Sequence, residues 1–428
     1  MSRPLLLVVS IDGFADFYWR DPAVRAPALR GLAARGVVAD GMTAVFPSTT
    51  WPTHVSMVTG VRPARHGVVA NHVLNRASRR TEDLTGDPIY DASALLAAPT
   101  VYDHAAAAGR RVAAIDWPAT RHARSLAFNL PFFKDQRVFE TQTAREVWDE
   151  LVAAGFAMDR QGEWAALPKR FMKDAMVAEV AAHVVRRHSP DLLLVHFLCV
   201  DSHQHLYGPR SPEAYWAVEY VDGCIARMLA AMPASARDSM TVLVVSDHGF
   251  LPVERDIRPN VRLRRLGALR GDGAAGFGGE ACFVMNHGAG YLYALDGDAA
   301  AVRTLAAEIA TMEGVAAAWP RAGFGELGLP ADHPMLPDVV FEAKSGYQFS
   351  DETAGSEENG APKYRGTHGQ RPDVPGNAAF FMATGAGITP GAQPGAIQSR
   401  DVAPTLAALL AVPMPDVEGR VLGEILSA

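Results

Sequence analysis

The sequence predicts an α/β fold in which a mostly parallel central sheet is covered by helices on both faces. Short runs of branched apolar residues alternate along the chain with longer, Ala-rich stretches whose apolar positions follow helical spacing. The short runs are apolar almost throughout, as expected for parallel strands that are buried on both sides. Hydrophobic residues make up 49% of the 428 residues and charged residues 20%, an ordinary balance for a globular chain.

The individual elements follow from these two periodicities. In chain order, we predict a strand at 5–10, helices at 26–35 and 101–108, a strand at 112–115, helices at 144–154 and 172–187, a strand at 192–197, a helix at 212–232 and a strand at 242–246. Strands that alternate with helices are joined by crossover connections, which place helices on both faces of the sheet.

Residues 251–364 interrupt this alternation. They contain three recognisable units, namely a Gly- and Ala-rich cluster expected to be a loop at 271–279, a helix-plus-strand unit at 299–318 and a polar loop at 350–362. We therefore predict an α/β core formed by residues 1–250 and 365–428, with residues 251–364 inserted as a cap subdomain. A C-terminal helix at 402–410 completes this core.

Composition excludes several classes of protein. Forty Lys and Arg against 47 Asp and Glu give a net charge of −7, which argues against a nucleic-acid duplex or an anionic membrane surface as partner. The three cysteines include no Cys-x-x-Cys pair, so neither a disulfide framework nor a thiolate metal site is expected. No apolar stretch reaches about 18 residues, so no membrane span is expected. Without a signal-peptide pattern we expect a cytoplasmic protein; no motif indicates its oligomeric state.

Carboxylate and imidazole side chains occur at the ends of predicted strands or beside glycines. These residues are Asp12, Asp201, His205, Asp247, His248 and His368. Ligands of parallel sheets bind beyond the carboxyl ends of the strands, which is where the three aspartates fall. A single strand-end Asp more often caps a helix, but the whole set predicts a metal site. Mixed N and O donors suit zinc, with manganese, iron or cobalt as other divalent candidates.

Three hydroxyl residues, Ser48, Thr49 and Thr50, lie where a loop enters a helix, and Pro52 suits the first turn of that helix. A helix N-terminus favours negative charge, and a bound metal lowers the pKa of a coordinated hydroxyl. One of the three is therefore a candidate nucleophile. The alternative is that they only cap the helix, and composition does not choose among them.

Ordered motifs extend this picture along most of the chain. They are TWPTHVSMVTG at 50–60, PARHG at 63–67 followed by Asn71, DSHQHLYGP at 201–209, SDHG at 246–249 and GTHG at 366–369. With them the chain resembles the nucleotide pyrophosphatase/phosphodiesterase family of the alkaline phosphatase superfamily, in order from residue 5 to about residue 385.

The resemblance implies two zinc ions, or other divalent transition metals, as cofactors. One ion would be held by Asp201, His205 and His368. The other would be held by Asp12, Asp247 and His248, with Thr50 also on this second ion. Two such ions clamp the attacking and leaving oxygens of an in-line displacement.

The resemblance also implies roles around the nucleophile. Thr50 would form a phospho-threonine intermediate, and Asn71 would donate to a non-bridging phosphoryl oxygen. Trp51 stands where the family has Phe or Tyr, so it either stacks on the leaving group or packs as a core aromatic. We expect His54 and His66 to be structural. The implied activity is hydrolysis of a small-molecule phosphate diester or nucleotide.

Other readings use the same fold. A phosphonoacetate hydrolase would need a cation for the substrate carboxylate, for which Lys134 is a candidate. A phosphate monoesterase would need an arginine or a further metal, and no such residue stands out. A sulfatase is disfavoured because no Cys-x-Pro-x-Arg motif occurs. A non-catalytic metal-binding relative would have lost ligands, whereas all positions are intact. His72 and His203 differ from the usual family residues and receive no role.

Overall fold

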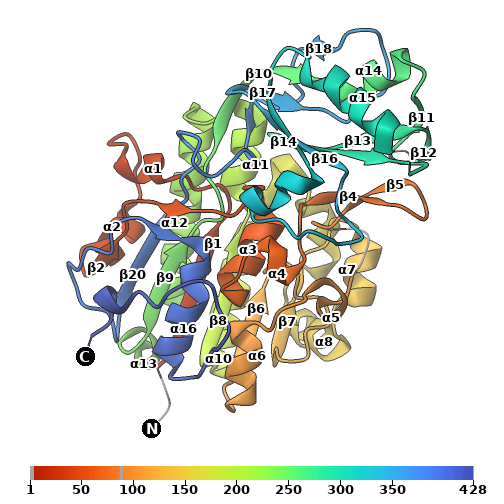
Figure 1. The fold of residues 1–428 in the computed structure, drawn as a ribbon. Coiled ribbons are helices and arrows are strands. Elements are labelled where there is room, and N and C mark those ends of the chain that lie inside the picture. The colour runs from red at the N-terminus through yellow and green to blue at the C-terminus, as the bar shows by residue number, and fades with distance from the viewer. Residues whose placement is uncertain (1–3, 87–89, 298, 428) are drawn as a thin grey trace.

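The computed structural model describes residues 4–86, 90–297 and 299–427, and its centre is a seven-stranded sheet (Figure 1). The strand order is β2 (Gly36–Val38), β20 (Phe381–Gly385), β9 (Thr241–Val245), β1 (Leu6–Ile11), β8 (Leu192–Phe197), β6 (Val112–Ile115) and β7 (Phe128–Leu130). β20 runs antiparallel to both of its neighbours, and the pairs from β9 to β7 are parallel. The predicted fold, α/β with a mostly parallel sheet, is confirmed.

The register of the three central strands aligns their carboxyl ends. Val9 of β1 lies opposite Val195 of β8 and Val244 of β9. The alignment continues past the strand, because the backbone N–H of Asp12 donates to the carbonyl of Phe197 at 2.9 Å. Residues that follow these strands therefore meet at one edge of the sheet.

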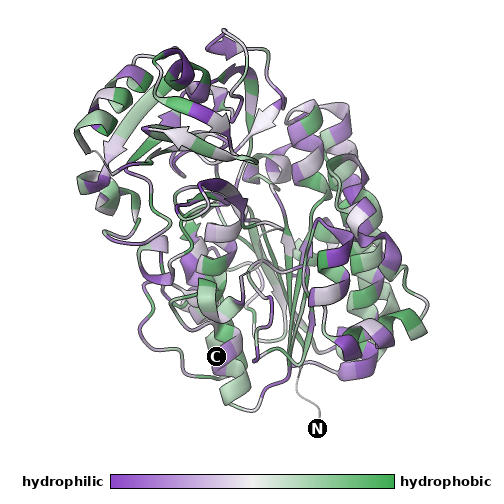
Figure 2. Ribbon diagram, turned by 90° about the vertical axis from the view of Figure 1, so that its right-hand side faces the viewer, coloured by the Kyte–Doolittle hydropathy of each residue, from purple (hydrophilic) through white to green (hydrophobic). Residues whose placement is uncertain are grey.

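Helices cover both faces of this sheet. The first face packs against α2 (Pro27–Ala33), α8 (Arg145–Ala153), α10 (Arg170–His188) and α12 (Pro212–Ala231), and the second against α3 (Thr50–Thr59), α6 (Val101–Ala107) and α16 (Val402–Leu410). Successive residues of β1 divide between the two cores, since Leu7 and Val9 belong to the first and Leu6 and Val8 to the second. Figure 2 shows the helices beside the sheet carrying both hydrophobic and hydrophilic residues.

Most segments between residues 251 and 367 form smaller sheets, drawn at the top of Figure 1. An antiparallel sheet has the order β13 (Ala281–Asn286), β14 (Ala289–Ala294), β16 (Val339–Ala343) and β15 (Val315–Pro320), and α14 (Pro259–Arg265) and α15 (Ala299–Ala310) pack on it. A second sheet joins β10 (Leu251–Ile257) to β17 (Gly346–Phe349), β18 (Asn359–Gly360) and β19 (Gly366–Thr367). The hydrophobic core of these sheets also includes Trp51 and Val55. The division into a core and an inserted cap at 251–364 stays a prediction.

The cluster at 271–279, expected to be a loop, is a hairpin of β11 (Leu269–Asp272) and β12 (Gly276–Gly279). The expectation was wrong because Leu269 and Phe277 are buried and give the hairpin an apolar side. Gly271 and Gly276 have positive φ angles of 73° and 113°, which glycine adopts without strain. A composition rich in glycine therefore marks a turn here and does not exclude strands.

The remaining α-helices and strands are short. They are α1 (Asp16–Arg20), β3 (Met42–Thr43), α4 (Pro63–His66), β4 (His72–Asn75), β5 (Arg80–Asp83), α5 (Ala92–Leu95), α7 (Gln136–Gln142), α9 (Gln161–Trp164), α11 (Cys199–Tyr207), α13 (Ala234–Arg237) and β21 (Ile397–Gln398). Within the described ranges, no helix combines the length and apolar character needed to cross a membrane.

Candidate metal centre

The six predicted ligand residues meet at the carboxyl edge of the central sheet. They are Asp12 after β1, Asp201 and His205 on α11, Asp247 and His248 after β9, and His368 after β19. Each is at most 5% exposed to solvent. Burying three carboxylates together is unfavourable unless cations or hydrogen-bond donors compensate their charge.

Asp12, Asp247 and His248 form one group whose ligand atoms lie within 4.8 Å of one another. His248 Nε2 lies 3.4 Å from Asp12 Oδ1 and 3.2 Å from Asp247 Oδ2. Gly13 fixes the carboxylate of Asp247, because its backbone N–H donates to Asp247 Oδ1 at 3.0 Å. Close packing requires Gly249 after this pair, since a Cβ atom there would lie 2.3 Å from the carbonyl oxygen of Gly376.

Asp201, His205 and His368 lie directly beside this first group. Asp201 Oδ1 is 3.2 Å from His205 Nε2 and 3.7 Å from His368 Nε2. The two groups adjoin, because Asp201, His248 and His368 also bring their ligand atoms within 4.8 Å. The rings of His248 and His368 stack with centroids 3.7 Å apart. The six residues thus form two adjoining sets of potential ligand atoms.

Backbone carbonyls orient the three imidazoles. In each ring Nδ1 lies within hydrogen-bond distance of a carbonyl oxygen, so Nδ1–H donates and the Nε2 lone pair faces the site. The pairs are His205 with Gly366 at 2.9 Å, His248 with Gly249 at 3.0 Å and His368 with Ser48 at 3.0 Å. Metal-bound histidines characteristically have their second nitrogen held in this way.

Several buried ligand atoms lack a hydrogen-bond partner in the part of the chain that the structure describes. They are Asp12 Oδ1, Asp201 Oδ1, Asp247 Oδ2 and His248 Nε2. Burial raises the pKa of Asp12, and the nearby carboxylate of Asp201 raises it further. Burial, followed by the charge of Asp12, likewise raises the pKa of Asp247. Divalent cations would satisfy these atoms and compensate their charge, so the donor set fits the metals that the sequence predicts.

The structure separates the three candidate hydroxyls. Ser48 Oγ donates to the Val45 carbonyl at 3.2 Å, and Thr49 Oγ1 donates to the Pro47 carbonyl at 3.5 Å. Both residues are fully buried, and the Thr49 side chain makes no capping hydrogen bond to α3. Thr50 is the first residue of α3, and it lines the same cavity as four of the six ligand residues, namely Asp12, Asp201, His205 and His368. Among described residues its hydroxyl has no hydrogen-bond partner, so it is the available one.

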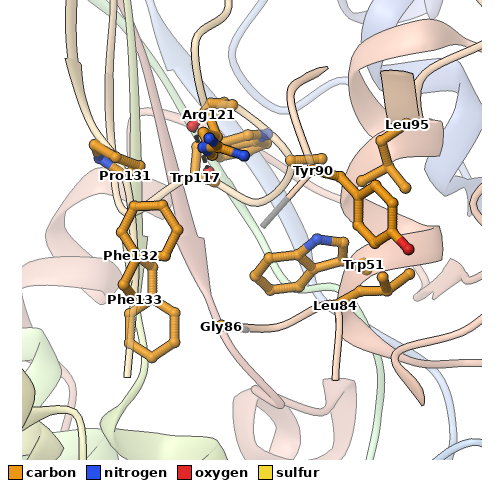
Figure 3. A pocket seen from close by; sticks show the side chains of 12 residues that line it. Trp51, Leu84, Gly86, Tyr90, Leu95, Trp117, Arg121, Pro131, Phe132 and Phe133 are labelled. Carbon is orange, nitrogen blue, oxygen red and sulfur yellow. Dashed lines mark hydrogen bonds between the residues drawn. The ribbon is translucent and has the colours of Figure 1, made fainter. Parts of the chain in front are cut away.

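Asn71 and Trp51 are linked next to Thr50. The backbone N–H of Trp51 donates to Asn71 Oδ1 at 2.9 Å, which fixes the orientation of the amide. Asn71 and Trp51 both line a cavity of about 540 Å³ in front of the ligand residues. Trp51 and Phe132 also line a smaller, largely apolar pocket beside it, where Figure 3 shows Trp51 between Phe132 and Tyr90.

Two basic residues of the cavity, Lys134 and His72, contact the same carboxylate, that of Asp83. The Lys134 ammonium contacts Asp83 and donates to Thr85 Oγ1 at 2.7 Å. His72 Nε2 lies 3.5 Å from the other oxygen of Asp83. Burial acts to raise the pKa of Asp83, but His72 and Lys134 outweigh it and hold that pKa well below its usual range. The charge of Lys134 is therefore largely compensated within the protein.

The structure adds residues that the sequence did not single out. Arg170, the first residue of α10, lines the cavity, and its Nη1 lies 3.5 Å from Asp201 Oδ2. His287 lies between β13 and β14 and joins His205 and His368 in a third group of possible ligands. No sequence spacing connects these two residues to the motifs. Only their types, a basic residue before a helix and a His-Gly pair at a turn, gave a signal.

Three other histidines make hydrogen bonds within the protein. His54 lies 2.8 Å from Ser10 Oγ through Nε2 and 2.8 Å from the Thr50 carbonyl through Nδ1. His66 Nε2 lies 3.0 Å from Ser56 Oγ, and His66 Nδ1 accepts from the Val68 N–H at 3.1 Å. His203 Nδ1 lies 2.9 Å from the Cys199 carbonyl. His203 forms no ligand group among described residues.

The family model and the similar proteins described next all point to the same family. The family model for type I phosphodiesterase / nucleotide pyrophosphatase matches residues 6–371. An uncharacterised pyrophosphatase/phosphodiesterase of Schizosaccharomyces pombe is 27% identical over 254 residues, which are 58% of this chain and 45% of that protein. Human ectonucleotide pyrophosphatase/phosphodiesterase family member 1 is 23% identical over 250 residues, 58% of this chain and 24% of that protein. The match spans less than half of each relative.

Solved structures share the fold over nearly the whole chain. Murine ectonucleotide pyrophosphatase/phosphodiesterase 5 aligns with a TM-score of 0.74 at 19% identity, covering 99% of this chain and all of the other. An inactive variant of the same murine protein, in complex with AMP, gives a TM-score of 0.75 with the same coverage. The human counterpart gives 0.75 at 17% identity.

Proposed function

Because the chain belongs to the type I phosphodiesterase / nucleotide pyrophosphatase family, we propose that it hydrolyses phosphate diesters or nucleotides with two divalent metal ions. One observation carries the proposal most directly: Thr50, whose hydroxyl has no hydrogen-bond partner among the described residues, lines the same cavity as Asp12, Asp201, His205 and His368. The AMP complex of the related murine protein supports a small nucleotide as ligand. The cytoplasmic location stays a prediction.

The ligand residues divide between two sites. Asp12, Asp247 and His248 would hold one ion. The other would be held by Asp201, His205 and His368. When bound, two zinc or similar ions neutralise charge on the phosphoryl oxygens and lower the pKa of an oxygen nucleophile. The unsatisfied carboxylate oxygens described above are the reason that cations of this charge fit.

Thr50 acts as the nucleophile in this proposal. Its hydroxyl gives up a proton as its oxygen forms a bond to phosphorus, and the bond from phosphorus to the leaving oxygen breaks, which leaves a phospho-threonine and releases the leaving group. A water molecule then attacks phosphorus, which releases the phosphate monoester and returns a proton to the threonine oxygen, so that the hydroxyl is regenerated. The start of α3 stabilises negative charge at Thr50 through its exposed backbone N–H groups and its dipole.

Asn71 positions and stabilises the phosphoryl group. Its Oδ1 accepts from the Trp51 backbone, so its Nδ2 amide group is the donor that remains for a substrate oxygen. A fixed donor aimed at developing charge costs no reorganisation during the reaction. Trp51 and Phe132 line both the cavity and the neighbouring apolar pocket, which suits stacking on a planar leaving group or nucleobase.

Two alternative substrates differ in their support. Phosphate monoesters carry a second negative charge, and Arg170 in the cavity wall is a cation that could meet it, although it is shared with Asp201. Phosphonoacetate is less well supported, because Lys134, the candidate for its carboxylate, is already paired with Asp83. The monoester is therefore the second candidate.

The proposal is tested by turnover of metal-loaded protein on four substrates in parallel. They are bis-p-nitrophenyl phosphate, a nucleoside-monophosphate p-nitrophenyl ester, p-nitrophenyl phosphate and phosphonoacetate. We expect kcat/KM to be highest for the two diesters. Higher values for the monoester or phosphonoacetate would overturn the substrate class, and absence of turnover on all four would overturn the enzymatic proposal.

A further inference from the structure

His287 lies beside the proposed metal centre but comes from outside the predicted core. It occupies the turn between β13 and β14, and its ligand atom lies within 4.8 Å of those of His205 and His368. The His287 ring is 4.8 Å from the His205 ring at an interplanar angle of 26°, and 4.6 Å from the His368 ring. It also lines the cavity that contains Thr50.

The hydrogen bonding of His287 differs from that of the structural histidines. Its Nδ1 is buried and, like Nδ1 of His72, has no hydrogen-bond partner within residues 4–86, 90–297 and 299–427; unlike His72, His287 also belongs to a group of possible metal ligands. By contrast, both ring nitrogens of His54 and of His66 are bonded. A buried polar atom that lacks a partner calls for a ligand or ion to satisfy it. Packing alone therefore gives an incomplete account of His287.

The backbone holds His287 in place at some cost. Its φ angle is +61°, a left-handed conformation that is uncommon for residues other than glycine. Asn286 anchors one side, since its side chain accepts from the His72 N–H and donates to the His72 carbonyl, both at 2.9 Å. On the other side the N–H of Gly288 donates to the carbonyl of His368 at 2.7 Å. Strained residues fixed in this way are concentrated at functional sites.

We propose that His287 is a fourth protein ligand of the metal ion held by Asp201, His205 and His368, an inference that rests on the proposed two-metal function. Zinc takes four ligands readily and expands to five during catalysis, so a substrate oxygen still has room to bind. The consequence is that the segment predicted to be a cap supplies part of the metal centre. Seating of the β13–β14 turn and retention of this ion would then depend on each other.

The test measures metal binding and does not depend on turnover. Metal-free protein is titrated with Co²⁺ alone, and visible absorption and competition with a chelator give the stoichiometry and the affinity of each site. His287→Phe keeps a stacking ring but offers no ligand nitrogen. His287→Asn suits the left-handed backbone and removes the ring. His72→Phe is the matched control, because His72 lies 6.2 Å from the His287 ring in the same cavity but forms no ligand group among described residues.

We expect wild type to bind two ions. Both His287 variants should lose at least roughly 100-fold in affinity at one site, more than the usual loss for residues that only contact ligands, and the Co²⁺ spectrum of that site should change. His72→Phe should leave both affinities unchanged. Circular dichroism checks that each variant is folded.

Three results would overturn the inference. If His287→Phe binds both ions as wild type does while His287→Asn does not, the ring only packs. If both variants match wild type, His287 has no part in metal binding. If wild type itself binds no divalent metal, both this inference and the two-metal proposal fail. The first two results, by contrast, would overturn only the role of His287.

Discussion

Thr50 differs from Ser48 and Thr49 because it lines the cavity and because its hydroxyl has no hydrogen-bond partner among the described residues. Thr50→Ala should therefore reduce kcat by at least about 10⁴-fold, the scale on which a nucleophile is lost. Both metals should stay bound, because the six ligand residues are untouched. Thr49→Ala is the matched control, since its hydroxyl already donates to the Pro47 carbonyl. Steady-state kinetics with elemental analysis decide the point, and substantial turnover by Thr50→Ala would transfer the role to another group.

The amide of Asn71 performs two separable tasks, anchoring the Trp51 backbone and donating to substrate. Asn71→Ala removes both and should lower kcat by roughly 10²–10³-fold, the effect of losing one oxyanion donor. Asn71→Asp keeps the acceptor for Trp51 but removes the donor, so we expect a loss at least as large. Recovery of activity in Asn71→Asp would instead show that anchoring Trp51 is the important task.

At the residue scale, motif positions could be anticipated from sequence more fully than their surroundings. Asp12, Asp201 and Asp247 each follow an apolar run, so strand prediction alone brought them to one edge. The residue pattern alone did not decide which of Ser48, Thr49 and Thr50 is the nucleophile, because only three-dimensional contacts show which hydroxyl is already hydrogen-bonded. His287 could not be predicted, since its approach to His368 depends on how a distant hairpin folds back onto the sheet.

Among the helices, α3 and α4 are joined through a buried histidine. The Val68 N–H donates to His66 Nδ1 at 3.1 Å, so Nε2 carries the proton toward Ser56 Oγ, 3.0 Å away. Protonating Nδ1 would break the bond from Val68. Burial accordingly lowers the pKa of His66 from its usual 6.5 to about 3.

This shift predicts a pH dependence of stability. Above pH 6.5 the ring is neutral in both folded and unfolded states, and its contribution is complete. Between pH 6.5 and 3 only the unfolded state binds the proton, so stability falls as pH falls, by about 2 kcal/mol at pH 5. Urea unfolding at pH 7.5 and at pH 5 should show that the free energy of unfolding falls by about 2 kcal/mol less in His66→Gln than in wild type. Equal losses in the two proteins would contradict the assignment.

Helix α10 is tied to the end of β6 by a buried ion pair. Lys173 Nζ lies 3.0 Å from Asp116 Oδ2, and neither side chain is exposed. Lys173→Met leaves the carboxylate buried without a cation and should cost about 3–5 kcal/mol in the free energy of unfolding. Adding Asp116→Asn should recover much of this loss, because Asn is neutral and tolerates the φ of +54°. Chemical denaturation of the single and double variants tests this; a near-neutral single variant would contradict it.

Long helices could be predicted from the sequence where the spacing of apolar residues and the residues that mark helix ends agree. The C-terminal helix at 402–410 was predicted to the residue. Pro212 at the first position of α12 and the Ser211 cap mark that helix start clearly. β2 and β7 were not predicted, because three residues are too few to show a period. β20 was also missed, since its antiparallel place between β9 and β2 follows from long-range pairing.

For the whole molecule, bound metals should stabilise the fold as well as serve catalysis. A ligand that binds only the folded state at 1,000 times its Kd adds about 4 kcal/mol. Treatment with EDTA should therefore lower Tm and abolish turnover, and added zinc should restore both. Thr50→Ala should show the same fall in Tm, which separates stabilisation from chemistry. An unchanged Tm after verified removal of metal would contradict a structural contribution.

The predicted cap, residues 251–364, begins shortly after His248 and ends shortly before His368, and the rings of these two histidines stack on each other. The ends of this long excursion are therefore already together, so its closure entropy changes slowly with length, by about 0.6 kcal/mol for each doubling. Evolution can lengthen, shorten or exchange such an excursion cheaply while the reacting groups at its base persist. If His287 is a fourth metal ligand, any segment that replaces this one would still have to place a histidine ring at the position of His287. The length and sequence of this segment could then vary between relatives that recognise different substrates, while the histidine at position 287 would be kept.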